Sequence, residues 1–84
     1  MSKCDKLLEK AKNSPNNFSF AEICQLAECY GFIFQRQSAS HIIYEHPTLK
    51  IEQNRLLNFQ NFKGQAKPYQ VKQLLKAISY LSNE

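Results

Sequence analysis

The sequence predicts a two-layer α+β domain in which helices pack on one face of a small antiparallel sheet. Apolar residues recur at helical spacing before residue 31 and after residue 68, and they alternate as in strands over much of the stretch between. An apolar fraction of 43% in 84 residues fits a single folded domain. We therefore expect one domain over residues 1–84, with an N-terminal helix and turn at 1–17 and a core at 18–82.

Two helices are expected in the first third of the chain. Residues 3–12 carry a short apolar stripe, and the turn-forming run NSPNN ends it. In the second helix, Ser19 and Glu22 have the spacing of a capping box. The apolar residues that follow recur at i, i+3, i+4 and i+7, which defines one helical face. Gly31 stands where a left-handed C-terminal cap is expected, so this helix should end there.

The apolar period changes from 3.6 to 2 after Gly31, which indicates strands. Three strands are expected, at residues 32–37, 41–46 and 55–62. The polar turn at 38–40 joins the first two strands, and Pro47 closes the second. A last helix is expected to have Pro68 in its first turn. Its apolar face consists of Val71, Leu74, Leu75, Ile78 and Leu81.

Alternation within the strands predicts which side chains face the core. Phe32, Phe34 and Arg36 share one face of the first strand. If this face meets the core, the register turns Ile42 and Tyr44 inward. The opposite face of the second strand then carries His41, Ile43 and Glu45. That face of the sheet stays open unless something else covers it.

The composition of the chain limits which partners, location and cysteine chemistry it is expected to have. A net charge of +4 is compatible with a nucleic acid or an acidic protein as partner. No segment reaches the roughly 18 apolar residues needed to span a bilayer, and the first residues lack the apolar stretch of a signal peptide. We therefore expect no membrane association and a cytoplasmic location. Three cysteines, Cys4, Cys24 and Cys29, are an odd number for an unexported chain, so we expect reduced thiols.

The spacing of two cysteines and two histidines superficially matches a zinc finger. Cys24 and Cys29 are five residues apart on the expected helix, which separates them by about 140° around its axis. His41 and His46 are five residues apart on a strand, so they project from opposite faces. Four ligands arranged in this way cannot converge on one ion. We therefore expect no metal site and interpret the helix cysteines as small apolar residues.

Three segments in order resemble the HicA family of bacterial toxin endoribonucleases. The first, FAEICQLAECYGFIFQRQ, is similar to the family's helix, Gly-Phe pair and strand ending in Arg-Gln. The second, SASHIIYEHP, is similar to its Gly-Ser-His followed by apolar residues and His-Pro. The third, NFQNFKGQAKPYQVKQLLKAI, is similar to a subgroup's strand, Lys-Gly, Lys-Pro-Tyr-Gln-Val and helix. The resemblance runs from about Phe18 to Leu81.

This resemblance implies an α-β-β-β-α fold like that of double-stranded RNA-binding domains, here with an extra N-terminal helix. It also implies a toxin of a type II toxin–antitoxin system that cleaves messenger RNA without a metal or small-molecule cofactor. The partner would be a HicB-type antitoxin, and the family's catalytic histidine falls on His41. One departure is Ala39, where the family usually has glycine. A turn with positive φ there would strain alanine by roughly 1 kcal/mol.

A histidine can perform the chemistry that the resemblance implies. In metal-independent cleavage, the 2′-hydroxyl of RNA is the nucleophile, and His41 would remove its proton as general base. We expect Arg36, across the turn, to stabilise the charged transition state. Lys63 and Lys67 are candidate phosphate contacts. Ser40 shapes the turn and supports this site rather than acting as a nucleophile, because no Ser/His/Asp constellation is evident.

Other polar and aromatic residues have less specific interpretations. We expect His46 to be structural or to lie beside the RNA. Lys72 and Lys76 fit a solvated face of the last helix. Phe62 and Tyr69 could stack on nucleobases, but we expect both to pack at the start of that helix.

The sequence is also compatible with two other functions. The chain could be a non-catalytic RNA-binding module with the same fold and charge. It could also be an interaction protein whose open sheet face binds only another protein. In the toxin hypothesis the antitoxin covers that face, where Ile33 and Ile43 would offer apolar contact area.

Overall fold

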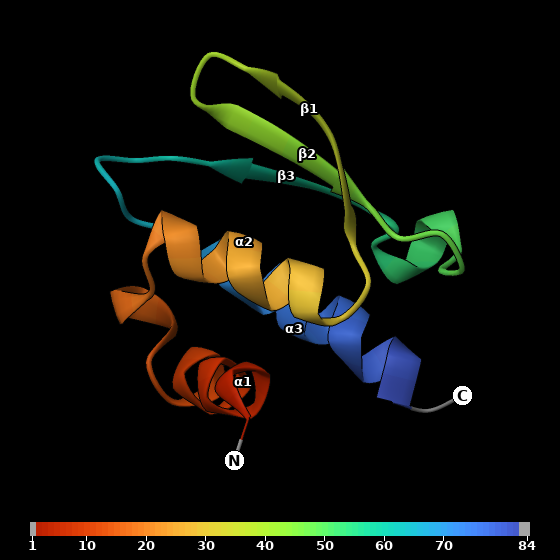
Figure 1. The fold of residues 1–84 in the computed structure, drawn as a ribbon, viewed down its shortest axis with the longest axis horizontal. Helices are drawn as coiled ribbons and strands as arrows, with labels where there is room; N and C mark the ends of the chain where they lie inside the picture. The colour runs from red at the N-terminus through yellow and green to blue at the C-terminus, as the bar shows by residue number, and fades with distance from the viewer. Residues whose placement is uncertain (1, 83–84) are drawn as a thin grey trace.

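A computed structural model describes residues 2–82 and shows an α+β fold. The elements are α1 (Lys3–Asn13), η1 (Pro15–Asn17), α2 (Phe20–Cys29), β1 (Ile33–Ser38), β2 (His41–Glu45), η2 (Ile51–Gln53), β3 (Leu56–Gln60) and α3 (Pro68–Ser82). The strands form an antiparallel sheet in the order β1-β2-β3. α2 and α3 lie along one side of this sheet, and α1 lies on the side of these helices away from it (Figure 1).

Both predicted ends of α2 are confirmed. Ser19 Oγ accepts a hydrogen bond from the Glu22 N–H, and Glu22 Oε1 accepts one from the Ser19 N–H, which completes the capping box. At the other end Gly31 has a φ of 89°. The Phe32 N–H then donates to the Ala27 carbonyl, as in a Schellman motif. The chain therefore leaves α2 in a fixed direction toward β1.

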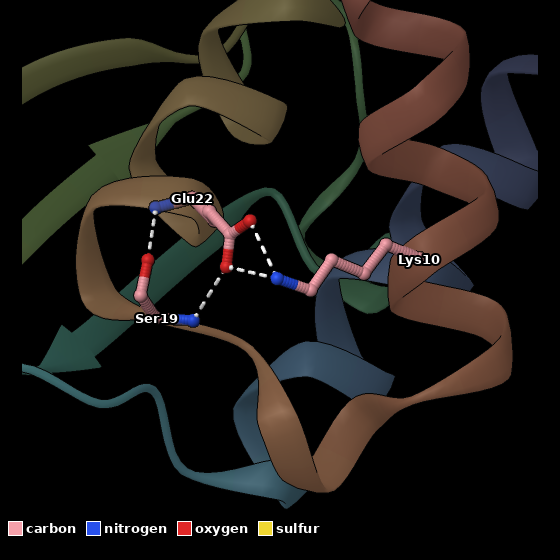
Figure 2. A network of polar contacts seen from close by, with 3 residues as sticks. All are labelled: Lys10, Ser19 and Glu22. Carbon is pink, nitrogen blue, oxygen red and sulfur yellow. Dashed lines mark hydrogen bonds and ion pairs between the residues drawn. The ribbon is translucent and has the colours of Figure 1, made fainter.

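The N-terminal helix is attached to α2 at two points. Lys10 Nζ lies 2.8 Å from Glu22 Oε2, an ion pair beside the capping box (Figure 2). Partial burial would raise the pKa of Glu22, but hydrogen bonds from Lys10 and Ser19 outweigh it and leave this pKa below its ordinary value. Near the other end of α1, Cys4 and Cys29 form a disulfide. The two helices therefore run antiparallel.

The expectation of reduced thiols is wrong for Cys4 and Cys29, and Cys24 is a free cysteine. The antiparallel packing of α1 on α2 brings the Cα atoms of the bonded pair to 5.8 Å. This distance lies within the range that a disulfide requires. Sequence spacing alone could not reveal this pair, because the two residues are 25 positions apart.

The core lies between the sheet and the helices. Its largest fully buried side chains are Phe18, Ile23, Leu26, Phe59, Val71 and Leu74. From β2, Tyr44 is buried against α2 and donates a hydrogen bond of 2.6 Å to Glu28 Oε2. The predicted inward orientation of Tyr44 is therefore confirmed, and the helices pack on this face of the sheet.

A bulge in β1 changes the predicted faces of that strand. Phe34 pairs with Tyr44 and Arg36 pairs with Ile43, so Gln35 is an extra residue without a partner across the ladder. The prediction that Arg36 shares a face with Phe34 is wrong, because one inserted residue reverses the alternation. Arg36 consequently lies on the same face as Ile43, directed away from the helices.

The strand β1 is the least covered part of the sheet. Every residue of β1 is exposed, and the β1–β2 hairpin rises away from the helices (Figure 1). Even Phe34, on the helix side, is 50% exposed. No helix within residues 2–82 has the length and apolar character that crossing a bilayer requires.

Candidate functional site

The face of the sheet directed away from the helices carries His41. In the ladder, His41 pairs with Ser38 of β1 and Gln60 of β3. Directly paired residues share a face, as do residues two apart along a strand. Ile43 and its partners therefore belong to the same face. We call this surface the outer face: Arg36, Ser38, His41, Ile43, Asn58 and Gln60.

Five of these residues line an open hollow of about 400 Å³. They are Arg36, Ser38, His41, Ile43 and Asn58. The bulge at Gln35 is what brings Arg36 into the hollow with His41. Within residues 2–82, neither the His41 ring nor the Arg36 guanidinium has a hydrogen-bond partner. An imidazole and a cation are therefore both available to a ligand at this site.

The turn before His41 has the backbone conformation that favours glycine. Ala39 has a φ of 53°, whereas Ser40 is not among the residues with positive φ. A positive φ at the first position of a two-residue hairpin turn favours glycine there. Alanine in this conformation costs roughly 1 kcal/mol. Ala39 occupies the position at which HicA-like sequences usually have glycine.

A second tight hairpin lies beside this turn. Phe62 and Gln65 exchange two backbone hydrogen bonds around Lys63 and Gly64, whose φ values of 53° and 82° fit a type I′ turn. The Asn61 N–H donates a hydrogen bond of 2.8 Å to the carbonyl of Ser40. This bond holds the second hairpin against the turn that precedes His41.

An exposed ring and two ammonium groups meet on this second hairpin. We call Phe62, Lys63 and Lys67 the Phe62 corner. Nζ of Lys63 and Nζ of Lys67 each lie 5.7 Å from the centroid of the Phe62 ring. Such cation–π contacts contribute about 0.5–1 kcal/mol at exposed sites. The expected packing of Phe62 and Tyr69 is wrong, since these side chains are 53% and 55% exposed.

A buried glutamine, for which the sequence indicated no role, bonds to the free edge of β3 beside the outer face. Gln70, only 3% exposed, accepts a hydrogen bond of 3.0 Å from the Gln60 N–H. Its Nε2 donates one of 2.7 Å to the Asn58 carbonyl. These backbone groups lie on the free edge of β3, so the Gln70 amide takes the place of a further strand. Gln70 stands in the Lys-Pro-Tyr-Gln-Val segment, but nothing in that segment indicated that its amide would bond to a strand edge.

The second histidine has a structural role. His46 is 6% exposed, and its Nδ1 accepts a hydrogen bond from the Thr48 N–H. Its Nε2 lies 3.1 Å from the Tyr30 carbonyl, to which it donates, and its ring packs edge-on against Phe32. A Cβ at Gly31 would lie 3.2 Å from Nε2, so this contact also favours glycine.

Other titratable groups lie away from the hollow. Burial, and then the hydrogen bond to Glu28, raises the pKa of Tyr44 well above its ordinary value. Burial likewise raises the pKa of the Cys24 thiol. In the part of the chain that the structure describes, no group of three or more His, Cys, Asp or Glu residues could hold a metal ion.

Comparisons with protein-family models, with curated proteins and with solved structures find no match for this chain. The resemblance to HicA therefore stays a prediction, and so do the roles assigned to His41, Arg36, Ser40, Lys63 and Lys67.

Proposed function

We propose that the chain is the HicA-like toxin of a type II toxin–antitoxin system, a metal-independent endoribonuclease that cleaves messenger RNA in the cytoplasm. His41 is its general base. The observation that carries this proposal is the hollow on the outer face. There the histidine picked out by the resemblance lies with an arginine, in a position open to a large ligand.

The order of elements supports a likeness to double-stranded RNA-binding domains. Residues from α2 to α3 follow the α-β-β-β-α order, and both helices lie on one side of the sheet (Figure 1). In this proposal α1 is an addition to that unit. It packs on the helices rather than on the outer face, so it leaves the hollow accessible (Figure 1).

The proposed reaction uses the RNA's own 2′-hydroxyl. His41 takes the proton from this hydroxyl, and the 2′-oxygen attacks the neighbouring phosphorus. The bond from phosphorus to the 5′-oxygen breaks, and water protonates this leaving oxygen. The products are a 2′,3′-cyclic phosphate and a 5′-hydroxyl. The lining of the hollow suits this route, since it holds an imidazole and no carboxylate among the described residues.

Nearby cations stabilise the charge that builds up on the phosphate. Arg36 lines the same hollow as His41, and a guanidinium can bind two phosphate oxygens at once. His46 cannot act as a partner acid. It is buried, and five strand positions separate it from His41 by about 17 Å.

A HicB-type antitoxin is the proposed protein partner, and it covers the outer face. Ile33 and Leu56 are 53% and 58% exposed. They pair with Glu45 on either side of β2, so they extend the outer face beyond the hollow. Such exposed apolar side chains next to a polar hollow suit a surface that another protein buries.

The test is cleavage of a generic messenger RNA in EDTA by the wild type and by His41→Ala. We expect the variant to lose about 10²–10⁴-fold in rate while it keeps its fold and its RNA affinity. Gln37→Ala is a matched control, because Gln37 is exposed on the same hairpin but pairs with Ile42 on the helix side. Equal cleavage by His41→Ala and the wild type would overturn the role of His41.

The second candidate is a non-catalytic RNA-binding module. Two observations favour it: the His41 ring has no orienting partner among the described residues, and Ala39 is strained. RNA binding without cleavage by the folded wild type would select this candidate. An absence of salt-sensitive RNA binding would instead favour a protein-only interaction surface, because phosphate contacts weaken steeply with salt.

A further inference from the structure

We propose that the Phe62 corner is a nucleotide subsite that binds an unpaired RNA base on the Phe62 ring, while Lys63 and Lys67 contact the adjoining phosphates. This inference rests on the proposed function, because it extends the RNA path from the hollow. It adds a substrate class, RNA that is single-stranded next to the cleaved bond.

Phe62 is not part of the hydrophobic core. This ring is 53% exposed and lies at a tight hairpin where Lys63 adopts a positive φ. Phe34 has a similar exposure of 50%, but it packs against the Tyr44 ring with centroids 6.1 Å apart. Within residues 2–82, Phe62 is the one exposed phenylalanine that cations flank. Its surroundings therefore fit a ligand that combines a flat apolar ring with negative charge.

A nucleotide can displace the lysines from the ring. Stacking of a base on an aromatic side chain is stronger than a cation–π contact at an exposed ring. The ammonium groups are on long, flexible stems, so they can move from the ring to phosphate oxygens a few ångströms away. Binding thus exchanges two weak internal contacts for one stacking contact and two ion pairs.

The subsite lies close to the hollow. His41 pairs with Gln60, and Phe62 is two residues further along the chain, a span of about 7 Å in extended backbone. The bond from the Asn61 N–H to Ser40 fixes this spacing. A nucleotide on Phe62 would therefore be next to, or one removed from, the nucleotide at His41.

The geometry requires an unpaired base. Inside a duplex each base face is covered by its neighbours, so a protein ring can stack only on a splayed or single-stranded base. An acidic protein segment is the competing occupant, because it too would pair with the lysines. It would not depend on an aromatic ring at position 62.

The experiment measures binding of a single-stranded 2′-O-methyl oligonucleotide by fluorescence anisotropy. The methyl groups block the proposed nucleophile, so the result does not depend on cleavage. We expect Phe62→Leu to weaken binding by about 5- to 50-fold and Phe62→Tyr to restore it. Phe34→Leu is the matched control, since it removes an equally exposed ring elsewhere, and should change affinity by less than about twofold.

An abasic position walked along the oligonucleotide identifies the stacked base. At one position the loss of the base should weaken binding to the wild type and have no further effect on binding to Phe62→Leu.

The salt dependence of binding tests the role of the lysines. Lys63→Gln with Lys67→Gln should reduce the slope of log affinity against log salt by roughly 1.4, or 0.7 for each lost phosphate contact. Lys72→Gln with Lys76→Gln removes equal charge from α3 and should leave it unchanged.

The outcomes separate this subsite from the proposed function. Equal affinity of Phe62→Leu and the wild type would overturn the subsite alone, and so would an unchanged salt slope in the Lys63/Lys67 variant. Equal affinity for a fully paired duplex of the same sequence would overturn the single-strand requirement. No binding of RNA by the folded wild type would overturn both proposals.

Discussion

The two histidines at the ends of β2 have opposite surroundings. His46, just after the strand, is buried and bonded through both ring nitrogens to Tyr30 and Thr48. His41, at the start of the strand, is partly exposed in an open hollow, and its ring has no hydrogen-bond partner among residues 2–82. One histidine is thus part of the structure, and the other is available to a ligand.

The difference extends to the neighbourhoods of these residues. His46 bonds to the end of α2, next to the Cys4–Cys29 disulfide, so several constraints hold that end of the sheet. The His41 end has a strained turn at Ala39 and the Phe62 corner. Buried polar groups in a folded protein are paired internally, as His46 is, whereas accessible ones can bond to water. The His41 and Arg36 side chains are therefore free to bond to a ligand in place of water.

The largest expected effect on stability is at the His46 end of the sheet, next to the Cys4–Cys29 disulfide. Cys4→Ser with Cys29→Ser should lower the free energy of unfolding by about 3–4 kcal/mol, from a closed loop spanning 25 residues. Cleavage per folded molecule should be unchanged. Urea unfolding and an RNase assay measure the two quantities. Loss of cleavage in the folded variant would show that the two ends are coupled.

His46→Ala should lower the free energy of unfolding by about 3 kcal/mol, since it leaves a cavity beside Phe32 and an unpaired Tyr30 carbonyl. The same substitution at His41 should change it by less than about 0.5 kcal/mol. Denaturant titration of both variants gives the comparison. Similar losses of stability would mean that the two histidines are equally structural.

Gln70→Leu should lower the free energy of unfolding by about 2 kcal/mol, because the Gln60 N–H and Asn58 carbonyl lose their partner. We also expect a lower cleavage rate, since both residues lie beside His41 or Ile43 in the ladder. Hydrogen exchange of the Gln60 amide would measure the loss of this hydrogen bond at the free edge of β3. Protection equal to the wild type would contradict the capping role of Gln70.

Ala39→Gly should raise the free energy of unfolding by up to about 1 kcal/mol, because it relieves the positive φ in the turn. Thermal unfolding measures this gain. Ala39→Ser is the control, as it keeps a Cβ and should give no gain. A destabilised glycine variant would show that the turn is not strained.

Local signals predicted the helix ends and the strands well. The capping box of Ser19 and Glu22 and the cap at Gly31 depend on neighbouring residues, so they can be identified in the sequence. The bulge at Gln35 could not be predicted, because the faces of a strand are assigned from the sequence by assuming regular alternation. Yet that one residue determines whether Arg36 joins His41 in the hollow.

The disulfide and Gln70 were missed for a different reason. Both depend on how segments distant in sequence pack together, and the Lys-Pro-Tyr-Gln-Val segment that contains Gln70 did not reveal a role for its side chain. His41 was identified through a family resemblance, whereas Lys63 and Lys67 were proposed as phosphate contacts because of their charge. The structure adds their surroundings: a shared hollow for His41 and Arg36, and an exposed ring between Lys63 and Lys67.

The most direct test of the central claim is the chemistry of the cut. An RNA oligonucleotide cleaved at one bond would be compared in EDTA with the same oligonucleotide carrying a 2′-deoxynucleotide on the 5′ side of that bond. We predict cyclic phosphate and 5′-hydroxyl ends from the RNA, no cleavage at the deoxy position, and cleavage by His41→Ala that is slower by about 10²–10⁴-fold. Cleavage of the deoxy substrate at the wild-type rate, or full activity of His41→Ala, would contradict the account.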